Sequence, residues 1–96
     1  MVMTGTALAV PAQAQPAQPY GTVIPSQGVN ERQFPSTDSS VRGSLPQGAQ
    51  TGLRCKVRAQ DVDGNTLWYL LRTRSTWVSA RHVANTGYVP YCKDVM

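Results

Sequence analysis

The chain has 96 residues, 41% of them hydrophobic and 15% charged, which is enough for one small domain. Its formal net charge of +4 favours anionic partners, such as wall polymers, nucleic acid or acidic proteins, without choosing among them. Two cysteines and one histidine do not match any familiar zinc-site spacing, and no stretch has the roughly eighteen apolar residues that a transmembrane helix needs.

Residues 1–14, MVMTGTALAVPAQA, carry no charge and end in Ala12-Gln13-Ala14. An A-x-A sequence after a short apolar run is typical of a signal-peptidase site, although the basic region that opens a signal peptide is missing. Two interpretations stand: a truncated signal peptide whose start lies upstream of Met1, or a disordered Ala/Gln/Pro tail. The even cysteine count favours the first, and with it a secreted protein, extracellular or attached to the cell wall. Residues 15–19 are a Pro/Gln linker.

A single domain is expected over residues 20–96, built from short strands separated by turn residues. The strand-like segments are residues 20–25, 28–34, 41–48, 51–60, 66–73, 74–80 and 84–92. DVDGN, residues 61–65, has Asp-Gly at its centre and predicts a hairpin turn rather than a calcium loop, because no bidentate Glu follows at the required offset. SARHV, residues 79–83, predicts one helical turn. Such a pattern indicates an all-β fold, either a small barrel or a sandwich.

Apolar and basic residues alternate over residues 53–58, which predicts a strand with one face in a core and the other in water. Cys55 belongs to the apolar set, and in a small secreted domain its pairing with Cys92 would form a disulfide; two unpaired buried thiols are the alternative. The basic set, Arg54, Lys56 and Arg58, is either a solvated face or part of a patch for anionic polymer. Arg72 and Arg74, which follow the hairpin partner strand, could extend that patch.

The order of several short motifs resembles the bacterial SH3-type domain, SH3b, in the small secreted form of actinobacteria. Asn30 and Arg32 match the family's N-x-R pair, Pro35-Ser36 its P-S, and residues 43–48, GSLPQG, its glycine turn. Trp68-Tyr69 and Trp77-Val78 match its two aromatic anchors. The resemblance covers about residues 20–92. It implies a small SH3-like barrel of five to seven short strands with one short helical turn.

The sequence departs from the family pattern at four places. Glu31 replaces an apolar residue, Phe34 and Thr76 replace glycines, and His82 replaces an aromatic residue. These positions surround the ligand groove of the family, so the resemblance implies a groove that is remodelled or lost.

The resemblance implies a secreted, non-catalytic binding module that docks cell-wall peptidoglycan peptides or anionic wall polymer. The ligand-binding residues that it suggests are Asn30, Arg32, Trp68, Tyr69, Trp77 and Arg81. The alternative is a secreted protein-binding factor, an inhibitor or toxin-associated protein that uses an aromatic groove. A nucleic-acid-binding barrel is the least favoured interpretation. No carboxylate pair, Ser-His-Asp set or phosphate-binding glycine loop predicts an enzyme, and no metal or cofactor is expected.

Overall fold

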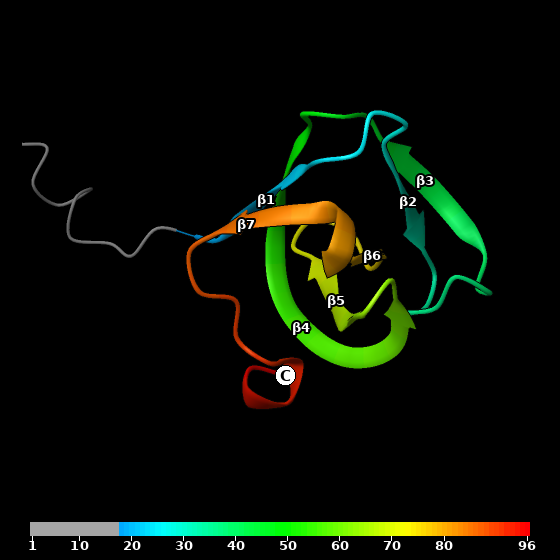
Figure 1. Ribbon diagram of the computed structural model, residues 1–96. Coiled ribbons are helices and arrows are strands. Elements are labelled where there is room, and N and C mark those ends of the chain that lie inside the picture. Colours follow the sequence, from blue (N-terminus) through cyan, green and yellow to red (C-terminus); the bar gives the residue numbers. More distant parts are fainter. Residues whose placement is uncertain (1–17) are drawn as a thin grey trace, which may run out of the picture.

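The computed structural model describes residues 18–96, which form one curled antiparallel sheet (Figure 1). Its strands are β1 Tyr20–Val23, β2 Val29–Arg32, β3 Val41–Leu45, β4 Gln50–Val62, β5 Asn65–Leu71, β6 Trp77–Ser79 and β7 Val83–Thr86. Two short 3-10 turns, η2 (Ala80–His82) and η3 (Cys92–Asp94), are the only helical elements among these residues. The expected all-β fold of five to seven strands with a helical turn at SARHV is therefore confirmed. The predicted signal peptide, residues 1–14, lies outside the described residues.

The strands follow the order β3-β2-β6-β5-β4-β1-β7 across the sheet. The long β4 bends through an arc around β5 and β6, which gives the sheet the shape of a half-barrel (Figure 1). The Asp-Gly hairpin forms as predicted: Asp63 and Gly64 both have positive φ, and Val62 pairs with Asn65 across the turn. Positive φ at both central residues is the type I′ geometry that fits the twist of two paired strands.

The main core fills the inside of the curled sheet with aliphatic side chains from several strands and from Val89, which follows β7, plus one tyrosine. It consists of Val23, Val29, Leu53, Tyr69, Leu71, Val78, Val83 and Val89.

A second, smaller core surrounds the disulfide between Cys55 and Cys92, which confirms the predicted pairing. Both sulfurs are buried with Leu70, and Val57 and Trp77 pack against them. The bridge ties the C-terminal segment, defined here as residues 87–96, to the middle of β4. At the same place the Lys56 amide donates to the Pro90 carbonyl at 2.9 Å.

The alternation of residues 53–58 is only partly realised, because β4 has an irregular register between Leu53 and Cys55. Leu53 lies opposite Leu71, whereas Cys55 lies opposite Leu70, so Arg54 is an extra residue in β4. One inserted residue reverses which face the following side chains occupy. Consequently Leu53 belongs to the main core and Cys55 to the second core, where the sequence predicted a single face.

Candidate binding groove

A groove opens between β2, the loop that follows it, the end of β4 and η2. It has a volume of about 210 Å³. Polar and aromatic side chains from β2, the loop after it, β5, β6 and η2 converge on it: Asn30, Arg32, Thr37, Trp68, Ser79 and His82. We call this the β2 groove. It is smaller than the pockets that hold drug-sized molecules, and its size suits one or two amino-acid side chains.

Hydrogen bonds hold the groove's side chains in place. The Trp68 indole donates to the Gln60 carbonyl at 2.9 Å, which fixes a buried ring against the groove. Arg32 donates through Nη1 to the Ser39 carbonyl at 3.0 Å. A guanidinium has five N–H donors, so this bond leaves Arg32 donors for a ligand. The groove therefore combines a cation and a buried indole, both held by hydrogen bonds, with the exposed side-chain amide of Asn30.

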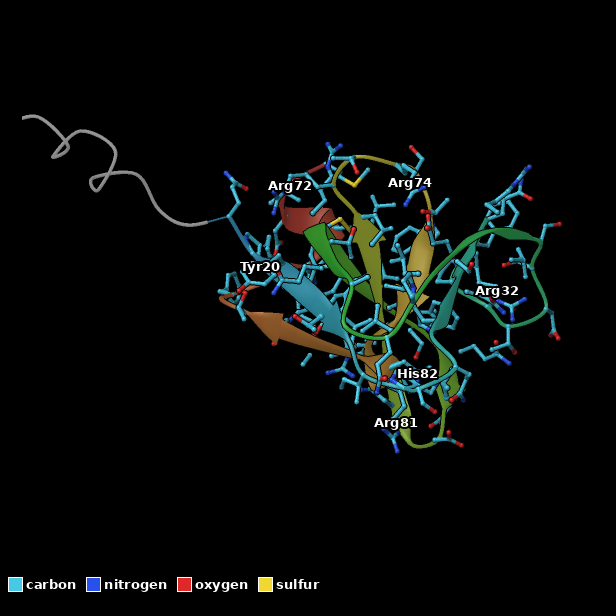
Figure 2. All side chains as sticks on the ribbon, turned by 90° about the horizontal axis from the view of Figure 1, so that it is seen from above. Tyr20, Arg32, Arg72, Arg74, Arg81 and His82 are labelled. Atoms are coloured by element: carbon cyan, nitrogen blue, oxygen red, sulfur yellow. A yellow bond between two sulfur atoms is a disulfide. The ribbon has the colours of Figure 1, made fainter. Side chains whose placement is uncertain are left out.

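Three of the six predicted ligand-binding residues, Asn30, Arg32 and Trp68, line the β2 groove. Arg81 is exposed on η2 beside His82 but does not line it, as the adjacent labels in Figure 2 illustrate. The other two lie elsewhere. Tyr69 is buried in the main core, where burial raises the pKa of its hydroxyl above the usual value, and Trp77 packs in the second core.

The five predicted patch cations do not share one environment. Arg54 and Arg58 are exposed, whereas the Lys56 ammonium lies 5.5 Å and 4.8 Å from the ring centroids of Tyr88 and Tyr91. Arg72 donates to the Pro19 carbonyl, and Arg74 pairs with a buried carboxylate. Figure 2 shows Arg72 and Arg74 at the opposite side of the molecule from Arg81 and His82. Arg58 also donates to Thr66 Oγ1 at 3.1 Å, so four of the five have a partner within the chain and only Arg54 has none among the described residues.

Two of the positions that depart from the SH3b pattern contact each other. Thr76 donates through Oγ1 to Glu31 Oε1 at 2.9 Å, and both residues are buried. Arg74 Nη2 lies 2.9 Å from Glu31 Oε2 and forms an ion pair with it. Of the four departures, only His82 lines the β2 groove, while Phe34 is exposed. No local pattern predicts the Glu31–Thr76 contact, because the residues lie far apart in the chain.

Residues 18–96 contain no cluster of three or more His, Cys, Asp and Glu side chains placed to hold a metal ion. In the same part of the chain, no helix has the length and apolar character needed to cross a membrane. No known family model matches the sequence, and no curated protein matches it significantly.

Proposed function

We propose that this protein is a secreted, non-catalytic binding module of the SH3b type, and that its β2 groove docks a short cell-wall peptide by a carboxylate. The observation that carries the proposal is the convergence of Asn30, Arg32 and Trp68 from two separate strands on one groove. Guanidinium groups bind carboxylates in paired, charge-assisted hydrogen bonds. The buried Trp68 indole backs the groove and supports the strand that carries these side chains, rather than offering an exposed face of its own.

Two further observations support the proposal. A disulfide in a domain of this size is typical of oxidising compartments outside the cytoplasm. The five motifs of the SH3b pattern also occur in the family's order along residues 30–78. Binding of an anionic wall polymer would instead depend on the cations of the predicted patch, most of which already have partners in the chain.

The test is a titration of the ¹⁵N-labelled protein with a synthetic cell-wall stem peptide that has a free carboxylate, followed by NMR. We expect the amide signals of β2 and η2 to shift, and Arg32→Gln to weaken binding at least about tenfold, the effect of losing a charged hydrogen bond. The matched control is Arg42→Gln, an exposed arginine on β3 that does not line the groove. An amidated peptide that binds as well as the free acid would contradict the carboxylate mechanism.

A secreted protein-binding factor remains the second candidate, and exposed aromatic side chains favour it. Phe34 is 59% exposed on the loop next to Arg32, and Tyr88 is 73% exposed on the C-terminal segment. Exposed aromatic residues are typical anchors of protein interfaces. If this candidate is correct, Phe34→Ser will abolish binding to the partner and leave stem-peptide binding unchanged.

A further inference from the structure

A second groove, which shares no lining residue with the β2 groove, runs along one edge of β4 beside η3. Its volume is about 490 Å³. Three consecutive residues of β4 and three consecutive residues of the C-terminal segment line it: Lys56, Val57, Arg58, Tyr91, Cys92 and Lys93. Neighbouring residues of a strand point to opposite faces, so a groove that takes three in a row lies along the strand's edge. We call this the β4-edge groove.

The edge of β4 is covered only in part within residues 18–96. β1 pairs with Gln50–Gly52, and Tyr91 forms an isolated bridge with Lys56. The C-terminal segment then turns away in η3, and no further bridge is found on that edge of β4 in this part of the chain.

The next amide along the open edge belongs to Arg58. The Lys56 amide points outward, because it donates to Pro90. The register to β5 is regular from Cys55 to Arg58, so the Arg58 amide, two residues on, points outward as well. An outward backbone amide on an open edge is a template for an added strand.

The charges around the groove have one sign. Three of its six lining residues are cations, and no Asp or Glu lines it. Tyr88 and Tyr91 hold the Lys56 ammonium in position by cation–π contacts. The nearby Asp61 instead accepts from the Gly64 amide at 2.7 Å inside the hairpin turn. The floor is apolar, formed by Val57 and the disulfide of Cys92.

We propose that the β4-edge groove binds an acidic peptide in extended conformation, added as a strand to β4 beyond Lys56. Backbone hydrogen bonds at the Arg58 edge would supply affinity. Carboxylates on the peptide would meet Lys56, Arg58 and Lys93, and an apolar side chain between them would rest on Val57. This site is separate from the β2 groove and does not depend on the function proposed there.

The probe is a fluorescein-labelled peptide with alternating Glu and Val, measured by fluorescence polarisation with the full chain. Two altered probes isolate the mechanism: one has Lys in place of Glu, and one is N-methylated at alternate backbone amides. We expect binding of the acidic peptide, no binding of the basic one, and loss of binding on N-methylation, because the methyl group removes the donors of an added strand. The double variant Arg58→Gln/Lys93→Gln, which keeps the tyrosine contacts of Lys56, should weaken binding about tenfold.

Two control variants test whether the peptide binds in this groove. Arg42→Gln should change the affinity less than twofold, and Arg32→Gln in the β2 groove should leave it unchanged. Equal binding of the N-methylated probe would overturn strand addition. Equal weakening by Arg42→Gln would reduce the effect to overall charge, and loss with Arg32→Gln would place the peptide in the other groove. Binding of dextran sulfate with no binding of the peptide would assign the groove to a different class of polymer.

Discussion

Glu31 places a carboxylate in the interior of the sheet, with 1% of the residue exposed. Burying a charge is costly unless it is paired and hydrogen-bonded. Thr76 and Arg74 supply the two partners, and Gly43, opposite Glu31 in β3, leaves the space. A Cβ at Gly43 would lie 3.3 Å from Glu31 Oε2. Three residues from two separate segments, the loop before β6 and strand β3, therefore accommodate a single unexpected side chain.

Thr76→Val tests this accommodation, since it keeps the shape of the side chain and removes the donor to Glu31. A buried acceptor left without its partner costs about 1–3 kcal/mol, so the free energy of unfolding in urea should fall by that amount. Glu31→Met/Thr76→Val, which removes both polar groups, should be close to the wild type. The exposed Thr73→Val is the control, with a change within about 0.5 kcal/mol. An unaltered urea midpoint for Thr76→Val would show that the hydrogen bond contributes nothing.

The buried hydroxyl of Tyr69 should make the protein less stable at alkaline pH. Its pKa is raised from the ordinary value of 10.0 because burial disfavours the phenolate. The unfolded chain therefore loses this proton at lower pH than the folded chain does, so stability falls as the pH rises above about 10. Urea unfolding at pH 8 and pH 10.5 measures the effect: the wild type should lose more stability than Tyr69→Phe. Equal losses in the two proteins would assign the alkaline effect to other groups.

At the scale of elements, β4 shows what a sequence pattern can and cannot predict. The Asp-Gly hairpin was predictable because positive φ at two successive positions demands particular residue types, and Asp63-Gly64 supplies them. The bulge at Arg54 has no such requirement, since any residue can be the extra one in a strand. A pattern with period two therefore predicted the strand correctly and the face of Cys55 incorrectly.

The C-terminal segment is the element that most depends on the disulfide. The bridge joins residues 37 apart in the sequence, which in the chain-entropy model contributes about 4 kcal/mol. At about 4–8 °C per kcal/mol for a domain of this size, Cys55→Ser should lower Tm by well over ten degrees. Reduction should also speed hydrogen exchange at the Lys56 amide, which bonds to Pro90, before it affects β5. Free-thiol labelling of both cysteines in the native protein would contradict the bridge.

For the whole molecule, curling of the sheet decides which residues meet. Asn30 and Arg32 could be placed on one strand from their spacing, but nothing local predicted that Trp68 and His82 would close the same groove. Lys93 likewise joins Lys56 and Arg58 because the disulfide and the Lys56–Pro90 hydrogen bond bring η3 to β4. Fold class follows from short-range patterns here, whereas both candidate sites depend on contacts between distant segments, which those patterns do not specify.

Export is the prediction that concerns the complete chain. Cleavage after Ala14 would remove a segment without charge, so the remaining protein would keep the net charge of +4. The cut lies upstream of β1, which begins at Tyr20, and of Pro19, whose carbonyl accepts from Leu53 and Arg72, so both of these features stay in the mature chain. We therefore expect a mature protein that starts at Gln15, appears in the culture medium or the cell wall, and unfolds at the same urea concentration as the uncleaved chain. Intact-mass analysis of the fractionated host measures the cleavage site directly, and a cytoplasmic protein that retains Met1 would exclude export.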